Sequence, residues 1–218
     1  MRVISVNVAS LRHSEHTGAP HGMTGIGKQP ADGPVAVAAP GPKGVGGSGL
    51  AGDAIGDMRH HGGDSQAVYA FAREDLDGWE RELGRPLPHG SFGENLTTSG
   101  VAVNDALIGE RWRIGDTVVL EVCTVRVPCR TFAGHLEQRG WVRRFTREAR
   151  PGAYLRVIEP GEIRAGDAVE IVRRPAHDVS VSLMFRALTT ERELLPRLLA
   201  AGDVLPPEER EIASRYPA

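Results

Sequence analysis

Short apolar segments, separated by glycine, proline and aspartate, are the feature that most restricts how this chain of 218 residues can fold. The segments are rich in Val and Ile, and in several of them apolar and polar residues alternate, as in a strand that buries one face. Gly115-Asp116 and Gly166-Asp167 are turn pairs directly before two of the segments, which is typical of a meandering barrel or sandwich. We therefore predict a mainly β fold with strands over residues 2–9, 34–39, 66–72, 116–127, 153–159 and 167–174.

Helical patterns interrupt and follow the β region. Residues 73–84 place Leu and Trp side chains at helical spacing and end in a glycine, which favours a helix that stops there. A second helix is predicted over 131–148, although two glycines lie inside it. Residues 179–218 have the pattern of three short helices, which are too small to hold a core alone and should pack on the β region or another subunit. We divide the chain into a β-barrel domain, 1–175, and a three-helix segment, 176–218.

Charge, hydropathy and cysteine content exclude several classes of protein. The 26 basic and 28 acidic residues give a formal charge of −2, which leaves no broad positive surface for a nucleic acid polymer. No run approaches the roughly 20 apolar residues of a membrane helix, and the start of the chain is too polar for a signal peptide, so we expect a cytoplasmic protein without membrane contact. The extended chain between Cys123 and Cys129 would span about 20 Å, which favours free thiols.

Several apparent motifs do not support the chemistry they suggest. The segment GVGGSG at 44–49 matches the dinucleotide pattern G-x-G-x-x-G, but the residues after it lack a helical apolar face, so we predict a flexible glycine loop. Lys43 precedes the glycines, which is the wrong order for a nucleotide-binding P-loop. A zinc site built from His60, His61 and Cys129 is disfavoured because adjacent histidines do not easily share one metal ion.

Two glycine-rich segments concentrate polar side chains that could bind a ligand. Residues 52–64 carry three Asp and two His ahead of a predicted strand, and the glycines would let the backbone approach a ligand closely. Residues 90–100 place Glu94, Asn95 and Thr97 between glycines, where they could form a hydrogen-bonding wall. Each segment has a second interpretation, in which these side chains only satisfy the backbone of turns.

The segment TVRVPCRTF, residues 124–132, singles out one thiol. The proline before Cys129 cannot donate to a sheet ladder, so the strand should end there and leave the cysteine at its rim. Arg126 and Arg130 flank the cysteine and would stabilise a thiolate, which is a better nucleophile and soft-metal ligand than a thiol. An inert buried cysteine is the alternative, and it describes Cys123, which lies within an apolar strand.

Four segments, GDAIGDMRHHGGDSQAVYAFA, GSFGENLTTSG, IGERWRIGDTVVLEV and RVPCRTF, occur in this order along the chain. Together they resemble the MOSC domain, a family named after the C-terminal part of molybdenum cofactor sulfurases. More narrowly, they are similar to its bacterial YiiM-like branch, which is linked to resistance against 6-N-hydroxylaminopurine. The resemblance covers nearly the whole chain, because TGIGKQPADGPVAV at 24–37 and the helical tail also fit this branch.

The resemblance implies a closed β-barrel of the MOSC type that holds a molybdenum pterin cofactor (Moco), with the Cys129 thiolate as the ligand of the metal. It also implies an oxidoreductase that reduces N-hydroxylated nucleobases or related compounds, as the mitochondrial amidoxime-reducing components do, with electrons from a redox partner protein. Asp57 or Glu94 would supply a proton to the departing hydroxyl group. The expected contacts of the cofactor are Lys28, His61, Asn95, Thr97, Arg126 and Arg130.

Two other functions stay open for the same thiol. Cys129 could hold a persulfide in a sulfur carrier or transferase, or the protein could be a non-catalytic carrier of Moco. Departures from the family pattern concern substrate choice more than the fold. Gln66 stands where the family often has lysine, Arg130 stands where lysine is common, and the glycine insertion at 41–49 is longer than expected. A homodimer is compatible with the sequence but not required by it.

Overall fold

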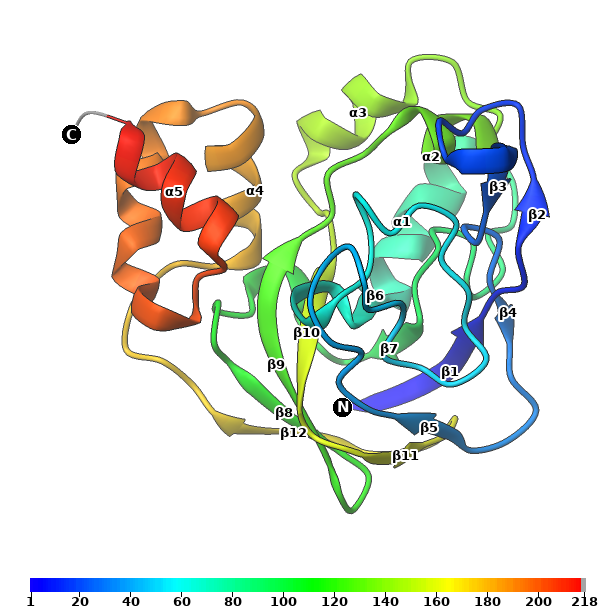
Figure 1. The fold of residues 1–218 in the computed structure, drawn as a ribbon, viewed down its shortest axis with the longest axis horizontal. Coiled ribbons are helices and arrows are strands. Elements are labelled where there is room, and N and C mark those ends of the chain that lie inside the picture. The colour runs from blue at the N-terminus through cyan, green and yellow to red at the C-terminus, as the bar shows by residue number, and fades with distance from the viewer. Residues whose placement is uncertain (217–218) are drawn as a thin grey trace.

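An eight-stranded sheet organises the protein in a computed structural model that describes residues 1–216 (Figure 1). Its neighbouring strands pair antiparallel, except β6 and β7, which run parallel. In spatial order the strands are β12 (Val169–Arg173), β8 (Arg111–Ile114), β9 (Val118–Val125), β10 (Ala153–Glu159), β6 (Val68–Ala72), β7 (Leu96–Ser99), β1 (Arg2–Val8) and β4 (Gln29–Pro30). Two small sheets pair β5 (Val35–Val37) with β11 (Gly161–Ile163) and β2 (Arg12–His13) with β3 (Met23–Thr24).

The six predicted strands are confirmed as β1, β5, β6, β9, β10 and β12. Strands β6 and β9 are buried along their whole length, which explains why their segments are nearly continuous runs of Val, Leu and aromatic residues. The sheet-dominated class predicted from these patterns is therefore correct.

The expected closed barrel is not formed by continuous strand pairing in the described residues, because the large sheet ends in two edge strands, β12 and β4. The backbone just before β12 does reach β1. The N–H of Val3 donates to the carbonyl of Asp167 at 2.9 Å, and Arg2 and Ala168 form an isolated bridge. The N–H of Gly166 also donates to the carbonyl of Val3 at 2.9 Å, and that of Val169 donates to the carbonyl of Met1 at 3.0 Å. Three backbone hydrogen bonds therefore connect the β12 edge to the start of β1, whereas β4, the strand at the other edge, pairs with the end of β1. The strand order remains that of an open sheet.

The first predicted helix is present and the second is divided. Helix α1 (Arg73–Leu83) ends as expected at Gly84, which takes the left-handed conformation with φ of 66°. The single helix predicted over 131–148 is wrong: the chain forms α2 (Arg130–His135) and α3 (Trp141–Glu148) instead. Gly140, with φ of 74°, separates them, because a left-handed residue cannot continue a right-handed helix.

The C-terminal segment forms three helical pieces, as predicted, on one side of the sheet (Figure 1). They are α4 (Val181–Thr189), the 3-10 helix η4 (Arg192–Val204) and α5 (Pro207–Arg215). Pro196 lies inside η4, where it removes a backbone donor and disfavours a regular α-helix. Shorter 3-10 turns are η1 (Pro20–Gly22), η2 (Asp64–Gln66) and η3 (Val103–Asp105). None of the helices within residues 1–216 is long and apolar enough to cross a lipid bilayer.

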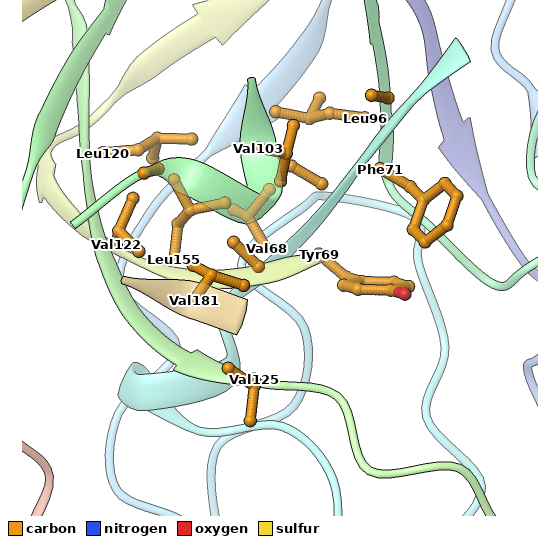
Figure 2. Close-up of a cluster of buried hydrophobic side chains, with 14 of the residues drawn as sticks. Val68, Tyr69, Phe71, Leu96, Val103, Leu120, Val122, Val125, Leu155 and Val181 are labelled. Atoms are coloured by element: carbon orange, nitrogen blue, oxygen red, sulfur yellow. The ribbon is translucent and has the colours of Figure 1, made fainter. Parts of the chain in front are cut away.

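One apolar cluster joins the sheet to the C-terminal segment. Figure 2 shows Val181 of α4 beside Val68, Val122 and Leu155 of the large sheet, and all four side chains are buried. The ring of Phe185 in α4 also meets Phe145 of α3 edge to face, with centroids 6.2 Å apart. The segment therefore packs on the β region, as its small size required.

A second group of buried rings fixes the part of the chain that follows Cys129. Phe132 of α2 packs edge to face against Phe92, Trp141 and Phe145, at centroid distances of 5.1 to 5.3 Å. Such aromatic contacts add about 0.5–1.5 kcal/mol each beyond the burial of apolar area. They anchor the start of α2 and so hold the cysteine that precedes it.

Candidate functional site

A cavity of about 790 Å³ lies at the end of strand β9. Its walls come from parts of the chain that are far apart in sequence, which are the loops around 16–28 and 48–66, the turn at 124–131, and helix α5. Tyr69, Asn95 and Tyr154 of the sheet region complete the lining. This volume is in the range of small-molecule and cofactor pockets.

Cys129 lines this cavity and is partly exposed. Strand β9 ends at Val125, as the following proline predicted, and Cys129 directly precedes α2. Cys123 is in contrast fully buried, and Arg156 donates to its sulfur at 2.7 Å. Burial raises the pKa of the Cys123 thiol to about 11, against the opposing effect of Arg156. Cys129 is therefore the thiol that a ligand can reach.

Arg126 is a buried cation in the cavity wall, with 7% of its surface exposed. It donates to the carbonyl of Phe92, and its guanidinium lies 4.0 Å from the ring centre of Phe132 and 5.2 Å from that of Tyr69. It has no carboxylate within ion-pair distance in the part of the chain that the structure describes. Burial acts to lower the pKa of Arg126, but Tyr69, Tyr154 and Cys129 nearby more than offset this and raise it. The guanidinium stays charged and close to the thiol.

Lys28 and Asn95 also line the cavity, and both are tied to Asp53. Asp53 forms an ion pair with Lys28, accepts from the Asn95 amide at 2.9 Å and accepts from the backbone N–H of Ala9 at 2.9 Å. Burial lowers the pKa of Lys28, and the charge of Asp53 partly restores it. Asn95 further accepts from the backbone N–H of Tyr69 at 3.1 Å, so the network joins the loop to β6.

Glu94 and Thr97 are fully buried and lie outside the cavity lining. Glu94 accepts from the backbone N–H groups of Gly90 and Phe92, at 2.6 and 2.9 Å, and from the Thr97 hydroxyl at 2.9 Å. Thr97 also accepts from the Asn7 amide at 3.2 Å. These bonds hold the turn over residues 90–97 in shape. Glu94 and Thr97 therefore stabilise this turn and do not lie where they would touch a ligand in the cavity.

Asp57 and His61 face the cavity from the loop over 52–64. Arg59 binds the Asp57 carboxylate through two nitrogens, each at 2.8 Å, and lowers the pKa of Asp57 to about 2. Arg59 thus favours the ionised form of Asp57, which does not favour the expected role of this residue as a proton donor. His61 keeps contact with solvent, but the surrounding protein and Arg126 lower its pKa to about 4, so it is neutral at pH 7.

Arg130 lines the cavity at its exposed side. It donates to the backbone carbonyl of Glu15 at 3.1 Å, and the neighbouring Thr131 hydroxyl donates to that of His16 at 3.4 Å. The structure therefore brings together seven residues of the predicted set, which are Lys28, Asp57, His61, Asn95, Arg126, Cys129 and Arg130.

The glycine insertion at 41–49 supports the cavity loop and forms no helix. The N–H of Gly63 donates to the carbonyl of Gly47 at 3.0 Å, so the two loops pack backbone on backbone. Gly63 has φ of 75°, and a Cβ there would lie 2.6 Å from the Cα of Lys43. Only glycine allows this close approach at position 63.

Tyr69, Tyr154, Thr124 and Glu209 are lining residues that the sequence did not single out. Tyr154 of β10 lies opposite Thr124 of β9 and opposite Tyr69 of β6, and the two tyrosine rings are 4.9 Å apart. The strand pairing creates this group, and no local motif reveals it. Glu209 arrives from α5, about 80 residues after Thr124 in the chain, and accepts from the Thr124 hydroxyl at 2.6 Å.

Metal-ligating side chains do not form a cluster. Within residues 1–216, no group of three or more His, Cys, Asp and Glu side chains is arranged to hold a metal ion. The disfavoured zinc site of His60, His61 and Cys129 therefore has no support in the geometry.

Comparison with known proteins agrees with the motifs and the fold. The family model for the MOSC domain matches residues 57–170. The uncharacterized protein YflK of Bacillus subtilis (strain 168) is 31% identical over 184 residues, which are 84% of this chain and 79% of YflK. A protein named reductase from Gibberella moniliformis is 31% identical over 185 residues, which cover 83% of this chain but only 31% of the fungal protein.

The fold agrees with a solved structure along almost its full length. The crystal structure of YiiM from Geobacillus stearothermophilus superimposes with a TM-score of 0.77 at 24% sequence identity, covering 98% of this chain and 97% of that one. The helical tail is therefore part of the shared architecture. The matched model, the relative YflK and the common fold together show that the chain belongs to the MOSC domain family.

Proposed function

We propose that this protein binds Moco in the cavity beside Cys129 and reduces N-hydroxylated nucleobases or related N-hydroxylated compounds. The MOSC domain is associated with the molybdenum cofactor, and one relative carries the name reductase, which supports this class of chemistry. In this proposal Cys129 is the protein ligand of molybdenum. Its exposure to the cavity and its softness as a donor both suit that metal.

The observation that carries the proposal is the charge of Arg126. Burying this guanidinium costs several kcal/mol of desolvation, which its contacts with Phe92, Phe132 and Tyr69 can offset, but no carboxylate in the described chain pairs with its positive charge. An anionic ligand would offset it, and a pterin cofactor that carries a phosphate is such a ligand. The exposed Arg130 adds positive charge to the same cavity, whereas the charge of Lys28 is balanced by Asp53. The donor set fits Moco in charge and in the softness of the sulfur.

The residues of the chain have separate tasks in this function. Arg126 and Lys28 bind the anionic part of the cofactor by charge-assisted hydrogen bonds, while Asn95 and Asp53 keep Lys28 in place. His61 is neutral and can accept or donate one hydrogen bond at the mouth of the cavity. When bound, the cofactor supplies the two-electron redox chemistry. An external protein would supply the electrons.

The test is metal content followed by activity. The protein is produced in cells that make Moco, and molybdenum and pterin are measured per chain. We expect about one molybdenum for each chain, and release of the amine from 6-N-hydroxylaminopurine when an artificial reductant is added. A protein that holds molybdenum in stoichiometric amount but does not reduce 6-N-hydroxylaminopurine would be a cofactor carrier and not a reductase.

A persulfide carrier is the competing function, because the partly exposed Cys129 thiol could carry sulfur without a metal. Cyanide-releasable sulfur on Cys129 in metal-free protein would support it. Protein that lacks both molybdenum and pterin after production in Moco-sufficient cells would contradict the proposed reductase.

A further inference from the structure

Helix α5 brings two carboxyl groups, those of Glu208 and Glu209, to the cavity wall. The Thr124 hydroxyl donates to Glu209 Oε1 at 2.6 Å, and both residues line the cavity. Thr124 begins a row across the sheet, opposite Tyr154, which in turn lies opposite Tyr69. Residues directly opposite each other in antiparallel strands share one face of the sheet, so this row faces the cavity together. Glu209 therefore stands at one end of a polar wall.

Glu209 differs from the other carboxyl groups in the cavity wall because each of those has a cationic partner within ion-pair distance. The pairs are Asp53 with Lys28, Asp57 with Arg59, and Glu208 with Lys43. Glu209 forms no ion pair with any residue of the stretch 1–216. A carboxylate held by a cation is a weak proton donor, whereas one that accepts only from neutral donors, here the Thr124 hydroxyl and a backbone N–H, can keep its proton.

The surroundings of Glu209 favour the protonated form. Burial raises the pKa of Glu209, and the charge of Glu208 on the same helix adds to this, while the Thr124 hydrogen bond and Lys43 act in the opposite direction. From β9, Cys123 also interacts with it, and this thiol is itself hydrogen bonded by Arg156. The net direction is upward, as a proton donor near neutral pH requires.

We propose that Glu209 delivers the proton to the departing hydroxyl group when an N-hydroxylated substrate is reduced in this cavity. The inference rests on the proposed reductase function and replaces the earlier candidates Asp57 and Glu94. Asp57 is held ionised by Arg59, and Glu94 does not line the cavity. It also gives the C-terminal segment a chemical task, since α5 contributes the acid.

The step balances as a two-electron reduction. The substrate R–NH–OH takes up two electrons from the reductant and two protons, and yields R–NH₂ and water. The N–O bond breaks, its electron pair leaves with oxygen, and Glu209 protonates that oxygen. The two supplied electrons remain on nitrogen, which takes the second proton from solvent. Solvent then returns a proton to Glu209.

The experiment uses Moco-loaded protein, 6-N-hydroxylaminopurine and reduced methyl viologen, with kcat and KM measured across the pH range. Glu209→Gln should lower kcat about 10²- to 10⁴-fold and abolish its decline at alkaline pH, while KM and molybdenum content stay unchanged. Glu209→Asp should recover part of the rate. Glu211→Gln is the matched control, because Glu211 lies on the exposed side of the same helix and pairs with Arg215.

A second readout does not depend on catalysis. In cofactor-free protein labelled with ¹³C at the glutamate carboxyl groups, NMR titration should show a carboxyl of raised pKa that is absent from Glu209→Gln and present in Glu211→Gln. An unchanged kcat and pH profile in Glu209→Gln, or loss of the alkaline decline in Tyr154→Phe instead, would overturn this inference alone. A wild-type protein that holds molybdenum but reduces nothing would overturn the proposed function and the inference with it.

Discussion

Replacing Arg126 with methionine should separate the contributions of this side chain to folding and to ligand binding. The folded protein would lose a charged hydrogen bond to Phe92, worth about 1.5–3 kcal/mol, and two ring contacts of about 0.5–2 kcal/mol each. It would also be relieved of a buried charge that has no carboxylate partner among the described residues, which costs several kcal/mol. These amounts are similar in size. We therefore expect the free energy of unfolding of cofactor-free protein to change by at most about 2 kcal/mol.

Ligand binding should respond much more strongly than stability. Loss of one charge-assisted hydrogen bond to an anionic cofactor costs about 1.5–3 kcal/mol, which is roughly a 10- to 150-fold weaker affinity. Urea denaturation of the cofactor-free variant measures the first quantity, and molybdenum retained after dialysis at graded dilution measures the second. Arg144→Met is the control, since Arg144 lies over Trp79 at 5.9 Å and pairs with Glu82 outside the cavity. A large loss of stability together with normal retention of molybdenum would refute the reasoning, because Arg126 would then be structural.

Three further predictions concern the cavity and its supports. Asp53→Asn should lower the free energy of unfolding by about 3–5 kcal/mol in urea titrations, because it leaves Lys28 buried without its partner. The control Asp178→Asn, at the exposed pair with Arg197, should cost at most about 1 kcal/mol. Equal losses would contradict a structural role for the Lys28–Asp53 pair. The folded-state pKa of His61, about 4, lies below its unfolded value, so the free energy of unfolding should fall as pH drops from about 6.5 toward 4. The variant His61→Asn should lose less stability over that interval. An equal loss in the variant would show that His61 is not the cause. In native protein treated with Ellman's reagent, Cys129 should react and release one equivalent of thionitrobenzoate, and Cys123 should release a second only after unfolding; rapid reaction of both would contradict the burial of Cys123.

Local sequence patterns predicted the longer strands well, because a strand with one or both faces buried is enriched in apolar residues. They failed where a strand is short and polar. β7 has the sequence LTTS, which does not alternate, and β8 has RWRI, which alternates but over only four residues. The helix expected over 131–148 was broken by left-handed backbone at Glu137 and Gly140, which the helical spacing of its apolar residues concealed.

The residues of the candidate site also differ in how well the sequence predicts their positions. The position of Cys129 at the cavity could be predicted because the proline before it ends the strand, and the position of Arg126 followed from the family resemblance; the roles of both stay predictions. Glu94 and Thr97 could not be assigned correctly, since a buried carboxylate that holds a turn has the same local sequence as one that faces a ligand. Glu209 was missed because only the docking of α5 on the sheet brings it to Thr124.

X-ray absorption at the molybdenum edge tests the ligation by Cys129 most directly. In loaded wild-type protein the metal should have one more sulfur ligand than in Cys129→Ser protein loaded with the same cofactor, and Cys123→Ser should give the wild-type count. If Cys129→Ser cannot retain the metal, its molybdenum content should fall while Cys123→Ser keeps a full complement. An unchanged sulfur count and an unchanged metal content in Cys129→Ser would contradict the central claim that this thiolate binds molybdenum.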